Sequence, residues 1–340
     1  MRMSSKVAAL AALMLLLSGC GGGGGSDDGG SGDAVPLEAE ADVLRELSML
    51  GGIAYELGYN IEPAAASTLR RSPMRQALMR GSKQRLPARK KASVAAAIDD
   101  GCDSGSVSTS SGSKNVSFQY YGASSSSDYE ISDYRDCVVD HSGDDYVDTD
   151  YDDGRIEVGA STNDASEVQY GYGQFGSGST PELYRNHYQE QGQAAQDNEV
   201  QTLGRVEFRS LQDGRFDQAL VASFDYRENN SYSLSLDLGQ TSAPFKLVQS
   251  GNGSLSIDGP YRYASSECEG GTATTTTHQA ITFNSQTGNV SGGQVRVNAG
   301  SDSVTITFNA DGSAGYLLGN GLSGTLNSAE VYDALQTPEC

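Results

Sequence analysis

The most regular feature of the chain is a two-residue alternation of apolar and polar side chains that begins after Cys102. Such alternation places apolar groups on one face of a strand and polar groups on the other, as in antiparallel sheets with one buried face. The alternating segments are Val116–Tyr120, Val168–Tyr172, Val206–Phe208, Leu220–Tyr226, Tyr232–Leu238, Leu255–Ile257, Val295–Val297 and Val304–Phe308. Turn-forming pairs occur between them, at Asp153-Gly154, Asp213-Gly214, Asn252-Gly253 and Asp311-Gly312. The pattern predicts a mainly β fold: a dozen or more short strands in an antiparallel up-and-down meander that forms a sandwich or open barrel.

Before Cys102 the apolar period changes to that of a helix. Apolar side chains three and four residues apart predict a helix over residues 37–58, and Gly51-Gly52 weakens its middle. A second short helix is predicted over residues 73–80, because Pro73 suits a first helical position and Gly81 suits a helix end. A short helical N-terminal segment is therefore expected before the sheet.

The first twenty residues have the layout of a secretory signal. Arg2 and Lys6 precede an eleven-residue apolar run, Val7–Leu17, which is too short to cross a bilayer. The run ends in Leu17-Ser18-Gly19-Cys20, which resembles the lipobox of bacterial lipoproteins residue for residue. The resemblance implies cleavage after Gly19, a lipid on the Cys20 thiol and a mature chain anchored to the cell envelope.

Residue 21 bears on which membrane would hold that anchor. In the sorting rule of Gram-negative lipoproteins, an Asp after the lipidated cysteine retains the protein in the inner membrane, and this chain has Gly21. The resemblance therefore implies the outer membrane, with either the periplasmic or the surface face open.

Four segments are expected from composition and pattern. Residues 1–19 form a signal peptide and residues 20–33 a lipidated Gly/Ser/Asp tether. Residues 34–98 form a helical, partly basic spacer, and residues 99–340 an acidic antiparallel β domain.

Four further cysteines fit an exported, oxidised chain. An even number in this setting predicts two disulfides, and of the three possible pairings we favour Cys102–Cys137 and Cys268–Cys340, the closest in sequence. Each would stabilise the fold by about 4 kcal/mol on the chain-entropy model. A zinc site is the alternative use, but no pair has the spacing of two to four residues that such sites show. We expect no metal and no cofactor.

The net charge of −21 is unevenly distributed. Residues 34–98 carry ten Lys or Arg and six Asp or Glu, whereas residues 99–340 carry eleven and 35. An acidic body of this kind repels phosphate groups, so nucleic acid is excluded as a partner. The basic stretch from Arg70 to Lys91 could lie on anionic lipid; alternatively, it is a solvated spacer that pairs with the acidic domain.

The densest acidic cluster runs from Asp144 to Gly154. Alternating carboxylates at Asp148, Asp150 and Asp152 before a glycine are typical of calcium loops. The register does not fit the helix-flanked calcium loop, so an acidic hairpin tip kept soluble by its charge is the alternative.

The sequence contains neither the zinc-binding His-Glu-x-x-His motif nor the Gly-x-Ser-x-Gly motif that presents a serine nucleophile. His141, His187 and His278 are each isolated from other histidines and cysteines, and we expect no enzyme and no catalytic residues. The 18 tyrosines could stack on sugar rings from a wet sheet face. The alternative, which such tyrosines follow more often, is that they fill a half-buried face with their hydroxyls in water, and the absence of tryptophan weakens the sugar signal.

Together these features predict a lipid-anchored envelope protein whose β-rich domain binds or scaffolds other envelope components without chemistry of its own. One alternative is a carrier or receptor that holds a small molecule or glycan inside a curled sheet, which requires a dry, continuous cavity of several hundred cubic ångströms. The other is an enzyme with a non-local site, in which His187 or His278 meets a carboxylate.

Overall fold

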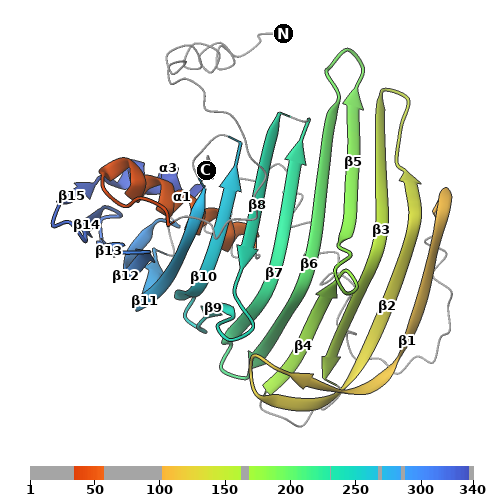
Figure 1. Ribbon diagram of the computed structural model, residues 1–340, viewed down its shortest axis with the longest axis horizontal. Helices are drawn as coiled ribbons and strands as arrows, with labels where there is room; N and C mark the ends of the chain where they lie inside the picture. Colours follow the sequence, from red (N-terminus) through yellow and green to blue (C-terminus); the bar gives the residue numbers. More distant parts are fainter. Residues whose placement is uncertain are drawn as a thin grey trace. The chain divides into compact units, whose positions relative to one another are not determined.

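The strands join one continuous antiparallel sheet, whose pairing path runs from β1 to β15 (Figure 1). The computed structural model describes residues 34–56, 102–161, 168–229, 231–266, 270–284 and 288–336. The fifteen strands in these ranges are β1 (Ser104–Phe118), β2 (Ala123–Asp140), β3 (Tyr146–Ser161), β4 (Val168–Phe175), β5 (Glu182–Glu190), β6 (Gln196–Leu211), β7 (Phe216–Glu228), β8 (Tyr232–Leu238), β9 (Phe245–Gln249), β10 (Leu255–Ser265), β11 (Gly271–Phe283), β12 (Val290–Ala299), β13 (Asp302–Phe308), β14 (Ala314–Leu318) and β15 (Ser323–Leu326). The helices in the same ranges are α1 (Glu40–Glu56) and α3 (Ser328–Gln336).

The predicted mainly β, antiparallel meander is confirmed, as is a helix near its N-terminal side. The helix expected over residues 37–58 extends from Glu40 to Glu56. The second helix expected over residues 73–80 lies outside the described residues. Several strands are longer than the short ones predicted, and the turn expected at Asp153-Gly154 is wrong, because β3 continues through both residues.

At two positions in the sheet, two consecutive strands together fill the place of one. Both β4 and β5 lie between β3 and β6: β4 pairs with the second halves of these strands and β5 with their first halves. In the same way, β8 and β9 both lie between β7 and β10. Each pair thus behaves as one strand with a six-residue excursion in its middle, at Gly176–Pro181 and at Gly239–Pro244.

The two excursions share a sequence pattern and a geometry. Each begins with glycine in the left-handed region, Gly176 at φ 74° and Gly239 at φ 76°, where an L side chain is strained. Each is closed by two backbone hydrogen bonds across its tip, between Ser177 and Thr180 and between Gln240 and Ala243. Proline, which donates no backbone hydrogen bond, precedes the strand that resumes. Gly-x-x-x-x-Pro is therefore the local signal for this interruption.

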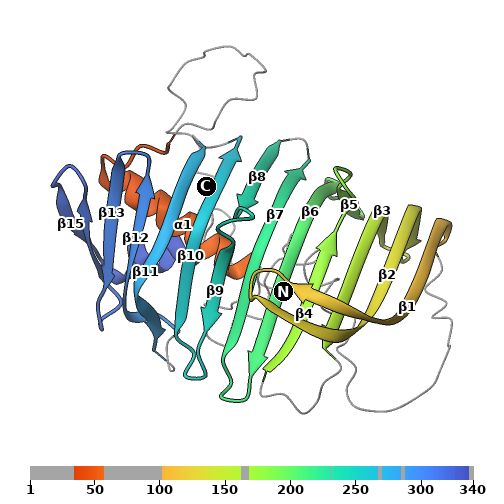
Figure 2. The ribbon, with the colours of Figure 1, turned by 60° about the horizontal axis from the view of Figure 1, so that its bottom comes forward.

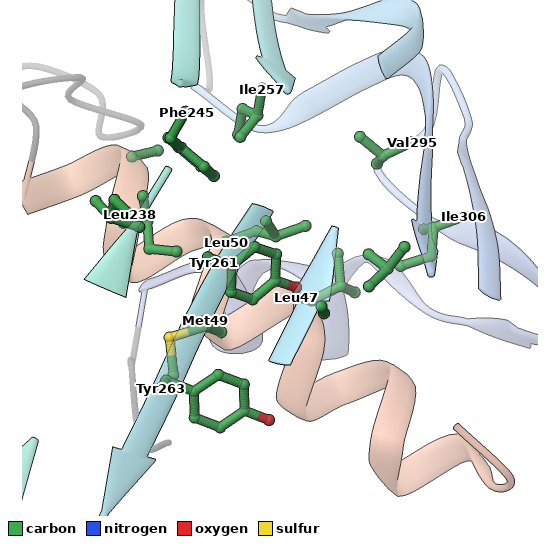
Figure 3. Packing of buried hydrophobic residues seen from close by; sticks show 14 of the residues in the cluster. Leu47, Met49, Leu50, Leu238, Phe245, Ile257, Tyr261, Tyr263, Val295 and Ile306 are labelled. Atoms are coloured by element: carbon green, nitrogen blue, oxygen red, sulfur yellow. The ribbon is translucent and has the colours of Figure 1, made fainter. Parts of the chain in front are cut away.

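One face of the sheet is covered by α1, and we call it the α1 face. Val43, Leu47 and Leu50 of the helix are buried together with strand residues from β3 to β15, in a single apolar cluster. Figure 3 shows Leu47, Met49 and Leu50 among side chains of β8, β9, β10, β12 and β13. Burying each such leucine contributes roughly 1.5–3 kcal/mol. Residues 34–56, the start of the expected spacer, are thus part of the core of the sheet.

Helix α3 packs on α1 and explains one of the two adjacent glycines. Asn327 caps α3 by accepting the backbone N–H groups of Ala329 and Glu330, while Glu330 accepts the N–H of Asn327. A Cβ at Gly51 would come within 2.6 Å of the Leu335 carbonyl oxygen and 2.8 Å of its Cα. The glycine lets the two helices approach closely.

Gly51→Ala is expected to destabilise the fold by about 1–3 kcal/mol, the usual range for overpacking a tight contact. Urea denaturation would measure the loss. Gly315→Ala in β14 is the matched control, since a Cβ there meets nothing within 4 Å. Equal stability changes for the two variants would contradict the close-packing explanation.

A buried carboxyl group joins α1 to the sheet. Glu46 has no exposed surface, and its carboxylate accepts the hydroxyl hydrogens of Tyr261 at 2.6 Å and Tyr263 at 3.1 Å. The Arg45 Nε lies 3.5 Å from the same group. Burial raises the pKa of Glu46, while the tyrosine hydroxyls and Arg45 oppose that rise.

Because the folded-state pKa of Glu46 is raised, its contribution to stability is present at low pH and is lost as pH rises through that value. Glu46→Gln removes this dependence and keeps a polar group opposite both tyrosines. We expect the melting temperature of the variant, relative to the natural protein, to increase as pH rises from the usual range of a glutamate carboxyl through the raised pKa of Glu46, and to level off above it. A difference independent of pH, or one that falls with pH, would refute this.

Candidate functional site

The predicted site cysteines divide into one observed pair and three residues outside the described ranges. Cys102 and Cys137 form a disulfide with a Cα–Cα distance of 5.2 Å, which confirms that half of the favoured pairing. The bond links the start of β1 to β2 at the open end of the hairpin that these strands form. Cys20, Cys268 and Cys340 lie outside the described residues, so the lipid attachment and the second disulfide stay predictions.

The three histidines lie on different strands or loops. His187 Nδ1 is 2.6 Å from Asp197 Oδ1, a direct cross-strand contact between β5 and β6. Both side chains are open to water, with exposed fractions of 40% and 61%. His141 Nε2 lies 3.5 Å from Asp150 Oδ2. The His187–Asp197 contact is therefore a solvated surface pair, and such pairs usually contribute about 0–1 kcal/mol to stability.

The acidic cluster is divided between a turn and a strand. Asp144 and Asp145 occupy the turn between β2 and β3, as an acidic hairpin tip would require. Asp148, Asp150 and Asp152 alternate along β3 and therefore share one face of it. Across the described ranges, no group of three or more His, Cys, Asp or Glu side chains could hold a metal ion.

On the face opposite α1, charged residues hold the end of the β1–β2 hairpin. Figure 2 shows this hairpin crossing over β4 and β6. Glu207 of β6 is fully buried, and its carboxylate accepts the backbone N–H groups of Gln119 and Tyr120, both at 2.9 Å, from the hairpin turn. Arg205 Nε donates to the same carboxylate at 2.8 Å.

Aromatic and apolar side chains complete this contact. Phe118 of the hairpin is buried against Tyr172 of β4, and its ring lies 5.1 Å from that of Tyr170. The Arg209 guanidinium lies 4.8 Å from the centre of the Tyr121 ring. Since these groups are used to attach the hairpin to the sheet, the cluster is structural.

Glu207→Gln is expected to destabilise the fold by about 1.5–3 kcal/mol, because an amide NH₂ would face a backbone N–H that the carboxylate now accepts. It should also raise protease cleavage within the turn at residues 119–122. Urea denaturation and limited proteolysis would measure both effects. Glu38→Gln, on the exposed surface, is the control; an equally small change for both variants would contradict the attachment role.

The α1 face carries a second, polar region beside the helix. Phe224, Leu236 and Tyr263 are successive cross-strand partners on β7, β8 and β10, and Tyr263 contacts Glu46 of α1. Strand alternation therefore places the even-numbered residues of β7 on the α1 face, and the registers carry that face across to β3. We call this region the tyrosine–amide face; it consists of Tyr146, Asp148, Asp150, Tyr184, Asn186, Tyr188, Gln196, Asn198, Tyr226, Glu228 and Tyr232.

Hydrogen bonds order the β3 and β5 part of this face. The Tyr184 hydroxyl donates to Asp150 Oδ1 at 2.6 Å. The Asn186 amide donates to Asp148 at 2.9 Å and to Asp150 at 3.1 Å. The rings of Tyr146 and Tyr188 lie 6.2 Å apart at the end of the same strands, and Tyr146 is 39% exposed.

The β6, β7 and β8 part has the same composition. The Tyr226 hydroxyl donates to Asn198 Oδ1 at 3.0 Å and contacts Glu228 Oε2 at 3.1 Å. The Gln196 amide donates to Glu228 Oε1 at 3.1 Å. The Tyr226 and Tyr232 rings lie 6.0 Å apart. The face therefore combines paired aromatic rings with amides and carboxylates held in fixed positions.

The apolar core contains a cavity that is much smaller than an ordinary small-molecule site. It is lined by residues of α1 and the sheet, including Leu47, Leu50 and Ile257, and has a volume of about 20 Å³. Small-molecule sites have volumes of about 300–1,000 Å³, so this cavity cannot hold such a ligand.

Sequence reasoning identified tyrosine on a wet sheet face as a sugar-stacking signal, but not which tyrosines gather. The alternation at Tyr232–Leu238 was recognised, whereas β5, with Tyr184, Asn186 and Tyr188, was not predicted as a strand. Its alternating Leu183, Arg185 and His187 carry too little apolar character to stand out.

No family model, curated protein or solved structure matches this chain.

Proposed function

We propose that this chain is a lipid-anchored protein of the cell envelope, on the outer membrane, and that its sheet binds other envelope components without catalysing a reaction. The anchor would be an acylated Cys20 at the new N-terminus. The binding element would be the tyrosine–amide face, and the partners would be other envelope proteins or glycans.

Two features support an exported, anchored chain. The first is the match of Leu17-Ser18-Gly19-Cys20 to the lipobox, which follows a charged start and a short apolar run. The second is the Cys102–Cys137 disulfide, since such bonds persist in oxidising compartments such as the periplasm. Within the described ranges, both helices are too short or too polar to cross a bilayer.

The observation that carries the binding role is the open arrangement of the tyrosine–amide face. Apart from the buried Tyr184, its side chains are partly or fully exposed, and their polar groups hold one another in place. Preordered aromatic and hydrogen-bonding groups reduce the ordering cost of binding a partner.

A carrier that encloses its ligand within the sheet is the less favoured candidate, because the cavity lined by Leu47 and Ile257 is far below the size of a ligand site. An enzyme that uses His187 is likewise less favoured, because the His187–Asp197 pair lies open to water on two adjacent strands.

The anchor can be tested by mass spectrometry of the protein purified from bacterial membranes. We expect the mature chain to begin at Cys20 and to carry acyl groups, and Cys20→Ser to abolish both processing and acylation. Cys102→Ser, which removes a cysteine elsewhere, should still be acylated. An intact Met1 and no lipid on the natural sequence would overturn the assignment.

A further inference from the structure

We infer that the tyrosine–amide face binds a carbohydrate chain of neutral or amino sugars by stacking sugar rings on its tyrosines. The inference rests on the proposed binding role and adds the chemical class of the partner. It does not depend on the lipid anchor.

The aromatic rings provide the first part of the argument. The Tyr146–Tyr188 and Tyr226–Tyr232 pairs lie at two positions on the same face, and each pair brings two rings within about 6 Å of each other. Partial exposure leaves ring surface available: Tyr146 is 39% exposed, and Tyr188, Tyr226 and Tyr232 are half-buried. The C–H groups of a sugar ring form an apolar patch that packs on such rings, while its hydroxyls stay free to hydrogen bond.

The polar side chains between the two pairs provide the second part. Direct cross-strand partners form a row that runs through Asp150, Asn186, Asn198 and Glu228 on β3, β5, β6 and β7, and the row ends at Tyr232 of β8, a ring of the second pair. Neighbouring strands lie about 4.8 Å apart, so this row spans about 19 Å. Carboxylates and amides at fixed positions along such a length match the regularly repeated hydroxyl and amide groups of a polymer.

Charge narrows the class of sugar. Asp148, Asp150 and Glu228 lie on this face, and cations of the same strands, such as Arg185 and Arg227, alternate onto the opposite face. The carboxylates repel uronic acid or sulfated polymers and attract an ammonium group. The face therefore favours neutral or amino sugars over acidic ones.

The shape of the site favours a chain over a single sugar. The face lies on the surface of five adjacent strands, and its exposed end at Tyr146 is open to solvent. A monosaccharide would contact one ring pair only, whereas a polymer can contact both pairs at once. Binding of the polymer at one pair raises the local concentration of sugar at the other, which strengthens the overall affinity.

The test uses the full lipidated chain in detergent and three polymers as probes: chitin, chitosan and alginate. Chitin is used as insoluble particles, and chitosan and alginate are immobilised on beads, so that depletion of the protein from solution gives the affinity for each polymer. We expect binding to chitin and chitosan and at least tenfold weaker binding to alginate. Equal binding to alginate, or no binding to chitin and chitosan, would overturn the inference.

The double variant Tyr146→Ala/Tyr188→Ala should weaken chitin binding about tenfold, because it removes one stacking position and leaves the other. Tyr332→Ala is the matched control: Tyr332 is 38% exposed, but it lies on α3. Equal affinity for the double variant and the control would reject the tyrosines as contacts. Circular dichroism would show that each variant is folded.

Tyrosine emission supplies an independent measurement, because the chain has 18 tyrosines and no tryptophan. Soluble chitin oligosaccharides should change the emission of the natural protein and of Tyr332→Ala, and change it much less in the double variant. If mass spectrometry finds acylated Cys20 while every polymer fails to bind, only the carbohydrate inference fails. If chitin binds to a chain without lipid, only the anchor fails.

Discussion

The structure depends on covering one apolar face of a single wide sheet. A lone sheet leaves one apolar face in water, and a second layer must cover it. Here α1 supplies that layer over the C-terminal strands, although its residues come before the whole sheet in sequence. Side chains of α1 lie in one buried cluster with those of β8, β9, β10, β12 and β13, so α1 and the sheet hold each other in place. The buried contact of Glu46 with Tyr261 and Tyr263 gives this packing one polar, directional interaction.

The part of the α1 face that the helix does not cover has a different composition. Toward β3 the apolar side chains give way to tyrosines, amides and carboxylates that hydrogen bond with one another. On the opposite face, the end of the β1–β2 hairpin covers part of β4 and β6, and Glu207 accepts hydrogen bonds from the backbone of the hairpin turn. The sheet is thus covered in part by a helix on one face and, over β4 and β6, by its own first hairpin on the other. The tyrosine–amide face is the polar region that we infer to bind sugar.

Local patterns were sufficient to predict the class of fold. Alternation at Leu220–Tyr226 and Val304–Phe308 predicts strands with one buried face. The three-and-four spacing of Val43, Leu47 and Leu50 predicts a helix. The pairing of Cys102 with Cys137 followed from proximity in sequence. The two apolar periods depend on near neighbours in the chain, which is why one sequence was enough to find them.

Features that depend on distant residues were not predicted. Asp153-Gly154 has the sequence of a hairpin turn, yet it lies inside β3, where Gly154 adopts φ 104° beside the junction of β4 and β5. Nothing near Gly51 in sequence indicates that α3 would pack against it. The tyrosine–amide face combines residues from five strands, so its composition was visible only after the registers were known.

The two Gly-x-x-x-x-Pro excursions have a consequence for how this chain can change in length. At Gly176–Pro181 and Gly239–Pro244, the strand pieces on either side are held separately by both neighbouring strands. The tips at residues 177–180 and 240–243 are exposed and add nothing to the ladder. Extra residues at either tip would leave the register of every strand intact, as insertions at exposed loop tips generally do. These are the places where evolution, or an engineer, could graft a new peptide onto the sheet without refolding it.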